Sequence, residues 1–90
     1  MTASTEPVHG HLIRVHSDDD GHYSNGSPYL WVCFVDAMIP GWVCELKGLV
    51  DPGNPECWRV AEAAARKLGY TCRYYERHIN GKTLVVFKEL

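Results

Sequence analysis

The sequence lacks the features that would direct a protein to or through a membrane. Residues 1–7 contain no basic cluster followed by an apolar run, so no secretory signal is visible. The longest largely apolar run, residues 29–37, is far shorter than the ~20 residues that a membrane-spanning helix needs. We therefore expect a soluble cytoplasmic protein with no membrane contact. In that compartment its cysteines should be reduced thiols.

Motifs for catalysis and cofactor binding are also missing. The chain has no Gly-x-Ser-x-Gly nucleophile turn, no phosphate-binding loop and no dinucleotide-binding fingerprint, and its eight glycines are scattered among turns. We expect no enzymatic activity, no catalytic residues and no cofactor. A small enzyme whose site is assembled without a motif stays open as an alternative.

The ligand spacing of a structural zinc site is absent, although there are five histidines and four cysteines. Cys33, Cys44, Cys57 and Cys72 lie 11, 13 and 15 residues apart, whereas zinc ligands usually come in close pairs. We expect these cysteines to be small apolar residues, with Cys33 in a core strand and Cys57 on the apolar side of a helix. No metal is expected, and a small metal-binding protein stays open as an alternative.

An acidic segment, Asp18-Asp19-Asp20-Gly21, resembles a calcium loop only in composition. Calcium loops place oxygen ligands at alternating positions and end on a bidentate acid, and no late Glu follows here. We expect a solvated acidic turn within a long exposed loop, residues 17–27. Together with Tyr23, the three acids are candidate contacts for a basic surface on a protein partner.

The net charge of −2 conceals an uneven distribution. Residues 1–53 carry two basic and seven acidic side chains, a net charge of −5, and residues 54–90 carry seven basic and four acidic ones, a net charge of +3. The second half is therefore where an anionic partner would bind.

The order of the predicted elements is β-β-β-α-β-β, within a single domain over residues 9–90. Residues 1–8 are polar and contain Pro7, so we expect a flexible N-terminal segment. We expect strands at 11–16, 28–37, 42–47, 70–79 and 82–90, with the second covered on both faces because it is apolar at odd and even positions. Pro40-Gly41 predicts a type II turn. The fold class is α+β: an antiparallel sheet of about five strands with one helix on one face.

The helix is predicted from a period of about 3.6 residues between Asn54 and Gly69. Asn54 suits the N-cap, Pro55 the first helical position and Gly69 the C-terminal end. Apolar residues recur at three- and four-residue spacing, from Cys57 and Trp58 to Leu68. We expect Glu62 to lie on the exposed side and to pair with Arg66.

The strongest candidate for a binding surface is the C-terminal hairpin. Asn80-Gly81 predicts a two-residue type I′ turn, which places alternate residues of both strands on one face. That face combines cations with an aromatic residue, and its candidate contacts are Arg73, Tyr75, Arg77, Lys82 and Lys88. Long basic side chains also cover apolar sheet faces and protect edge strands, so a purely structural role fits the same pattern.

The function that we expect is non-catalytic docking on a protein partner. Three Trp and five Tyr exceed what one small core easily buries, and exposed aromatic residues are typical of interfaces. The candidate aromatic contacts are Tyr23, Tyr29, Trp31, Trp42, Tyr74 and Tyr75. Small, mildly acidic domains without motifs are common among phage and mobile-element proteins that inhibit host defence or nucleic-acid-processing complexes, such as anti-CRISPR proteins, and this analogy suggests an inhibitor. A nucleic-acid-binding module that uses the basic hairpin is the alternative, and a homodimer would enlarge the small core.

Overall fold

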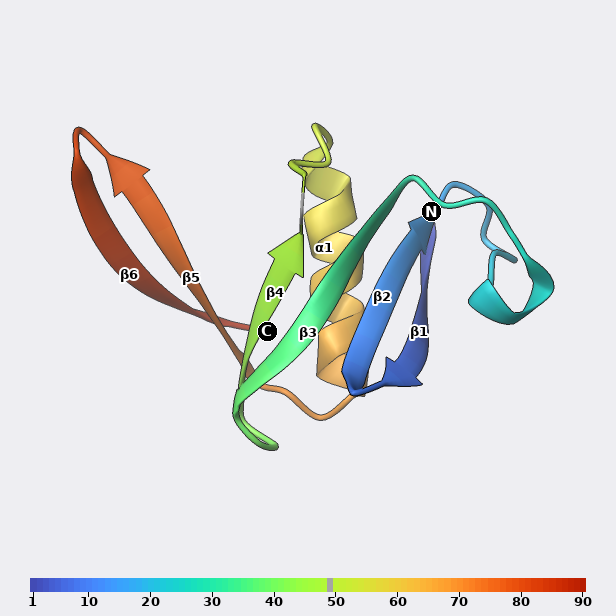
Figure 1. Ribbon diagram of the computed structural model, residues 1–90, viewed down its shortest axis with the longest axis horizontal. Helices are drawn as coiled ribbons and strands as arrows, with labels where there is room; N and C mark the ends of the chain where they lie inside the picture. The colour runs from blue at the N-terminus through green and yellow to red at the C-terminus, as the bar shows by residue number, and fades with distance from the viewer. Residues whose placement is uncertain (49) are drawn as a thin grey trace.

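A computed structural model describes residues 1–48 and 50–90, which form one sheet and one α-helix (Figure 1). The helix α1 follows the first four strands and precedes the last two. The elements are β1 (Thr2–Val8), β2 (Gly10–His16), a 3-10 turn η1 (Tyr23–Asn25), β3 (Trp31–Ile39), β4 (Val43–Gly48), α1 (Pro55–Lys67), β5 (Cys72–Ile79) and β6 (Lys82–Glu89).

The sheet has six strands in the order β1-β2-β3-β4-β5-β6. The α+β class is confirmed, but the prediction of about five strands missed β1. Residues 1–8, which were expected to be a flexible segment, contain this strand. Thr2 pairs with His16 and Val8 with Gly10 in an antiparallel register along the whole of β1. The side chains of this segment are polar because it is an edge strand, where Pro7 is also tolerated. Its pairing is carried by backbone hydrogen bonds, which the side-chain pattern does not reveal.

The expectation of a wholly antiparallel sheet is wrong at one junction. β4 and β5 run parallel, with Val43 opposite Cys72 and Glu45 opposite Tyr74. The reason is that α1 carries the chain from the end of β4 back to the level where β4 began, so the next strand runs in the same direction. This is the βαβ crossover that a parallel pair requires.

The helix packs its small residues on the sheet as its sequence predicts. The Asn54 side chain accepts a hydrogen bond from the Glu56 amide at 3.0 Å, and Gly69 has φ +104° just beyond the end of the helix. The buried apolar residues of α1 and of the sheet form one core: Ile13, Val15, Trp31, Cys33, Val35, Cys44, Leu46, Cys57, Ala61, Ala64 and Ala65. Trp58 and Leu68 pack against this cluster, so the predicted apolar side of the helix and the burial of Cys33 and Cys57 are confirmed.

The face of the sheet away from α1 has no second layer of helix in the described residues. β3 was expected to be covered on both faces, but residues 31–36 alternate between buried and half-buried, because only one face packs on α1, and residues 37–39 are exposed. The loop between β2 and β3 covers part of the open face. There His16 is fully buried, its ring bonded to the Ser4 hydroxyl at 2.7 Å and to the Pro28 carbonyl at 2.8 Å.

Two turns have the geometry that their sequences predict. Trp42 donates its amide to the Ile39 carbonyl at 3.0 Å across Pro40-Gly41, and Gly41 has φ +73°. Asn80 and Gly81 have φ of +52° and +74°, the positive values that a type I′ turn requires. Ile79 is accordingly opposite Lys82, so the register of the β5–β6 hairpin is confirmed.

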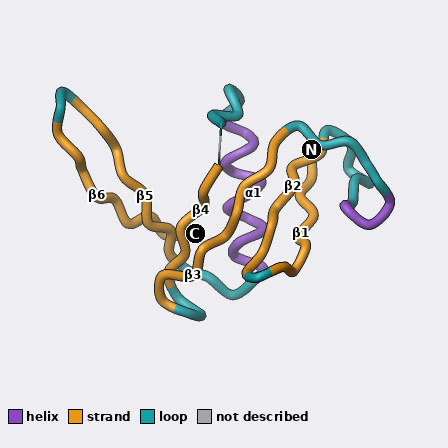
Figure 2. The backbone as a smooth tube through the Cα atoms, in the orientation of Figure 1, coloured by secondary structure: helices purple, strands orange, loops and turns teal. Residues whose placement is uncertain are grey.

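The β5–β6 hairpin, residues 72–89, projects from the rest of the molecule and is called the arm below. Figures 1 and 2 show it leaving the sheet beside β4 and pointing away from α1, while the η1 loop lies at the opposite side of the molecule. The molecule extends 42 × 28 × 21 Å along its principal axes, so it is elongated rather than spherical.

Candidate functional site: the cleft between β4 and β5

A cleft opens where the two parallel strands separate. β4 and β5 are paired at Val43–Glu45 and Cys72–Tyr74, and the pairing ends there although both strands continue (Figure 2). Residues 46–48 of β4 and 75–77 of β5 therefore line the two sides of this opening without pairing between them. Backbone donors and acceptors at such edges need a partner, which is water or another chain.

The cleft has a volume of ≈ 790 Å³ and a mainly polar lining. Trp58 and Tyr75 are its aromatic residues, and three basic and three acidic side chains surround them. The lining residues are Glu45, Leu46, Lys47, Gly48, Asp51, Trp58, Arg73, Tyr75, Glu76 and Arg77. We name this hollow the splayed cleft.

The charges of the splayed cleft are separated by sheet face. Arg73 contacts α1, so Tyr75 and Arg77, two and four residues further along β5, point to the same side. Glu45 and Lys47 alternate with the buried Cys44 and Leu46 and therefore point to the other side, as does Glu76. One side of the cleft is thus aromatic and cationic, and the other combines two acids with Lys47.

Arg73 is the structural centre of the arm's attachment. Its side chain is only 11% exposed, and its Nη1 donates to Oε2 of the buried Glu62 at 3.3 Å. Lys88, opposite Arg73 on β6, donates its Nζ to Oε1 of the same carboxylate at 2.9 Å. One carboxylate of α1 therefore binds both strands of the arm.

The Arg73 guanidinium lies over two aromatic rings. Its central carbon lies 4.3 Å from the ring centroid of Trp58 and 4.9 Å from that of Tyr75. Trp58 in turn packs edge-on against Trp31, with 4.5 Å between ring centroids. Such cation–π contacts are strongest where water is excluded, as around Arg73. The Nε atom of Arg73 is buried and has no hydrogen-bond partner among the residues that the structure describes.

The helix residue Glu62 was assigned to the wrong side from the sequence. It was expected to be exposed and paired with Arg66, but it is 8% exposed and is bound by Arg73 and Lys88. The reason is that the arm places Arg73 and Lys88 beside Glu62 on the helix. The helical period of the sequence does not indicate this contact. Trp31 was expected among the exposed aromatic contacts and is instead buried at 6%, with its Nε1 donating to the Val50 carbonyl at 2.8 Å.

The five basic-face candidates divide into two groups. Arg73 and Lys88 are bound to Glu62 at the base of the arm, whereas Arg77 and Lys82 are exposed further along it. Tyr75 is half-buried and lines the splayed cleft with Arg73 and Arg77. The register confirms that all five share one face of the hairpin.

The acidic candidates lie elsewhere. Asp18, Asp19 and Asp20 are exposed, and Asp19 accepts a hydrogen bond from the amino group of Met1 at 2.8 Å, which lowers the pKa of its carboxyl group. Tyr23 begins η1, where its amide donates to the Ser4 hydroxyl at 3.1 Å and its ring stacks on His22. Figure 1 shows this loop and the arm at opposite sides of the molecule, so the two sets of candidate residues do not form one site.

Sequence reasoning missed the residues that complete the cleft from β4 and α1. Trp58 was assigned to the apolar side of the helix, and no role was assigned to Lys47 or Asp51. Lys47 donates its Nζ to Asp36 at 3.0 Å, and this bond, with the attraction of Asp36 and Glu45, raises its pKa. The only available signal was that one helix joins two strands, since ligand sites often lie at the carboxyl ends of parallel strands.

Two buried cysteines are poorly suited to nucleophilic chemistry. Burial raises the pKa of Cys33 to about 12 and that of Cys44 to about 11, and the positive charge of Arg73 only partly offsets the effect. A thiol with so high a pKa carries almost no thiolate at neutral pH. These side chains act as small apolar residues of the core, as expected.

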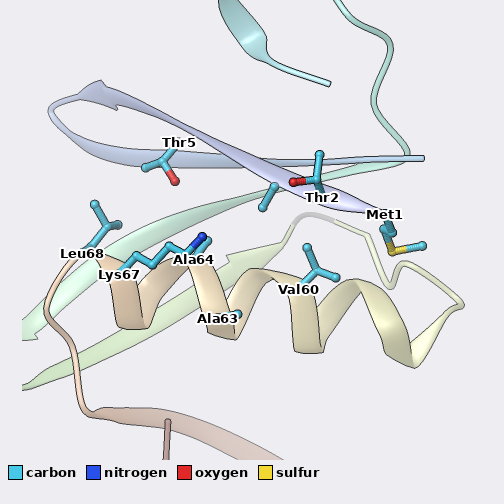
Figure 3. Close-up of a pocket in the computed structure, with 9 residues that line it drawn as sticks. Met1, Thr2, Thr5, Val60, Ala63, Ala64, Lys67 and Leu68 are labelled. Carbon is cyan, nitrogen blue, oxygen red and sulfur yellow. The ribbon is translucent and has the colours of Figure 1, made fainter. Parts of the chain in front are cut away.

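A second hollow lies between α1 and the edge strand β1. It has a volume of ≈ 440 Å³, and its lining is more apolar than polar. Figure 3 shows Val60 and Ala64 of α1 on one side and Thr2 and Thr5 of β1 on the other, with Lys67 beside the helix end. Lys67 is the only titratable side chain that lines it, so it offers apolar contact rather than an acid–base pair.

The described residues show neither a metal-ligand cluster nor a membrane helix. Over residues 1–48 and 50–90, no three His, Cys, Asp or Glu side chains are grouped closely enough to hold a metal ion. Within the same residues no helix has both the length and the apolar character needed to cross a bilayer. Comparison with protein-family models, with curated proteins and with solved structures found no match to this chain.

Proposed function

We propose that this protein acts without catalysis, by docking on a protein partner through the splayed cleft. The observation that carries the proposal is the pair of strand edges, 46–48 and 75–77, that line the cleft beyond the last paired residues of β4 and β5. An extended segment of a partner bonds to such an edge through its own backbone, and its alternate side chains enter the pockets on either side.

The lining of the cleft defines what that segment should carry. On the side of Tyr75 and Arg77 an acidic or aromatic side chain is favoured, because the arm presents a cation and ring faces there. On the side of Glu45 and Glu76 a basic side chain is favoured. The preferred partner is therefore an extended segment whose successive side chains alternate in charge.

A protein partner is favoured over a nucleic acid by the balance of charges. Three acids, Glu45, Asp51 and Glu76, line the same cleft as the three basic residues. Arg73 and Lys88 are also bound to Glu62, so among the described residues the cations on this face of the arm that make no ion pair are Arg77 and Lys82. Nucleic-acid binding depends on neutralising several phosphates with free Lys and Arg. We further propose that this docking inhibits a host defence or nucleic-acid-processing complex. This part of the proposal is supported by the analogy with small, motif-free phage and mobile-element proteins.

Site-specific photo-crosslinking in a lysate of the native host tests the proposal. A benzophenone amino acid at position 77 should crosslink one protein, while the same group at position 66, on the exposed surface of α1, should not. The crosslinked protein, once purified, should bind the wild-type chain, and Arg77→Glu should weaken that binding at least about tenfold because it reverses the charge at the cleft.

The contrary results are equally specific. Crosslinking of the same proteins from positions 77 and 66 would show non-specific capture and would refute the cleft. A salt-sensitive shift of labelled single-stranded nucleic acid that is lost in an Arg77→Ala, Lys82→Ala double variant would replace the proposal with the nucleic-acid alternative.

A further inference from the structure

The strand β6 is a free edge of the sheet with a regular set of backbone groups. It is the last strand in the sheet order and pairs only with β5 in the described residues. In a two-residue hairpin the pair that closes the turn, here Ile79 and Lys82, exchanges backbone hydrogen bonds, and bonded pairs then alternate along the strands. The backbone groups of Val85 and Phe87 therefore point away from β5.

The same edge carries exposed apolar side chains on both faces. Val85 is 55% and Phe87 is 62% exposed on one face, and Leu84 is 50% exposed on the other. The helix contacts the arm at Arg73 and Lys88 but leaves Leu84, Val85 and Phe87 exposed, and an isolated two-stranded hairpin is marginally stable in water. Apolar side chains grouped on an unpaired edge indicate a surface that is covered by another chain.

We propose that β6 pairs antiparallel with β6 of a second copy of this chain, about a two-fold axis at Val86. In this arrangement Val86 is opposite Val86 of the second copy, and Val85 is opposite Phe87 of the second copy on each side of the axis. The two arms form one continuous four-stranded sheet, β5-β6-β6-β5, with a shared apolar cluster on the Val85 and Phe87 face.

The register follows from symmetry and charge. A two-fold axis between antiparallel strands keeps equivalent faces together, so the axis passes through a residue position. Centred on Val86, Leu84 is opposite Lys88 and Thr83 opposite Glu89, and no like charges meet. Centred on Val85, Lys82 is opposite Lys88, a repulsive pair. Centred on Phe87, Val85 is opposite Glu89 and the overlap is shorter. Self-complementarity is therefore best about Val86.

This dimer goes beyond the proposed docking function and uses a separate surface. The splayed cleft borders the β4 side of β5, whereas β6 lies on its other side. The cleft stays open in both copies, so the dimer would present two clefts related by the same axis. Dimerisation and partner binding can then be tested independently.

Two experiments test the proposed dimer: sedimentation velocity, which measures the mass in solution, and disulfide formation by single cysteine substitutions on β6. Sedimentation velocity of the full chain should show a concentration-dependent shift from one to two chains. Val86→Cys should give a disulfide-linked dimer on mild oxidation, because the strand geometry brings non-hydrogen-bonded residues opposite each other to about 4.5 Å between Cα atoms. Leu84→Cys, on the same face of the same strand, should not, and neither should the wild-type chain with its native cysteines.

Charge exchange tests the contact between Val85 and Phe87. A chain with Lys at both positions and a chain with Glu at both should each be monomeric, with circular dichroism unchanged from wild type. Mixed together, they should form a 1:1 heterodimer, because each Lys is then opposite a Glu. A wild-type chain that is monomeric at millimolar concentration would refute the dimer. A dimer that crosslinks through Leu84→Cys but not through Val86→Cys would refute this register.

Discussion

The Arg73 guanidinium lies over the indole of Trp58, with 4.3 Å between its central carbon and the ring centroid. This contact joins the arm to the helix, and the same cation lies over the ring of Tyr75 in the lining of the splayed cleft. The same guanidinium bonds to Glu62, so stacking and ion pairing act on one side chain. Two kinds of interaction therefore determine its orientation.

Replacing Arg73 should be far more harmful than replacing an exposed arginine. Arg73→Ala leaves Glu62 buried with Lys88 as its one remaining basic partner, and breaking a buried pair costs about 3 kcal/mol. Arg59→Ala removes an exposed pair with Glu56 and should cost at most about 0.5 kcal/mol. Urea unfolding measures both values. Equal losses would contradict the structural role of Arg73.

A double-mutant cycle measures the interaction energy between Arg73 and Glu62. The losses for Arg73→Ala and Glu62→Ala should not add in the double variant, because removing both partners leaves no unpaired buried charge. Arg73→Lys should not restore full stability, since a lysine lacks the planar group that stacks on Trp58. Additive losses would show that the two side chains act separately.

At position 80, in the turn of the arm, glycine should be tolerated and alanine should be destabilising. Asn80 has φ +52°, which costs an ordinary residue about 1 kcal/mol. Asn80→Ala should lower the free energy of unfolding by about that amount, whereas Asn80→Gly should leave it nearly unchanged. Amide hydrogen exchange at β5 and β6 locates the effect. Faster exchange across the whole sheet instead of the arm would contradict a local cause.

Stability should fall as the pH rises through the range in which an unfolded cysteine ionises. The pKa of Cys33 is about 12 in the folded state, compared with its usual value of 9.0, because the thiol is buried. Between these two values the unfolded chain loses a proton that the folded chain keeps, so stability present below pH 9.0 is progressively lost. Urea midpoints measured across this range should decline less steeply for Cys33→Ala than for wild type. Parallel declines would contradict the assignment to Cys33.

Cysteine reactivity gives an independent check on burial. Iodoacetamide at neutral pH should modify the half-buried Cys72 well before Cys33 or Cys44, since the thiolate is the reactive form and both core thiols have raised pKa values. Mass spectrometry of peptides after timed labelling measures the order. Early labelling of Cys33 in the folded protein would contradict the packing of the core.

The long loop should depend on His16. Its buried ring bonds to the Ser4 hydroxyl and to the Pro28 carbonyl, so His16→Leu removes two hydrogen bonds and should cost about 2 kcal/mol. Limited proteolysis should then cut first within residues 17–30. Replacing the exposed His78 by leucine is the matched control and should leave the loop protected. Protection of the loop in the His16 variant would contradict this role.

Gly21 tests the same contact from the loop side. A Cβ at this position would press on the His16 side chain, whereas a Cβ at Gly53 would meet open space. Gly21→Ala should therefore loosen the loop as His16→Leu does. Gly53→Ala should leave loop proteolysis unchanged, although its φ of +72° carries its own local strain.

The elements with short-range determinants were predictable and the pairing between distant elements was not. The helix from Pro55 and the hairpin about Asn80-Gly81 follow from caps, periods and turn chemistry within a few residues. β1 was missed because a polar edge strand has no side-chain pattern, and its partner β2 supplies the bonds. The shared face of Arg73, Tyr75 and Arg77 followed from the hairpin register, whereas the cleft that they line depends on the parallel β4 beside them.

By itself the sequence determined the local conformations: where the helix begins and ends, which helix face is apolar, and which residues of the arm share a face. Only the tertiary structure decided that β5 lies parallel to β4, that the two strands separate after Glu45 and Tyr74, and that Glu62 is buried beneath Arg73. The physical reason is range. Caps, turns and alternation act between near neighbours in the chain, but burial and strand order arise from contacts between residues far apart in it.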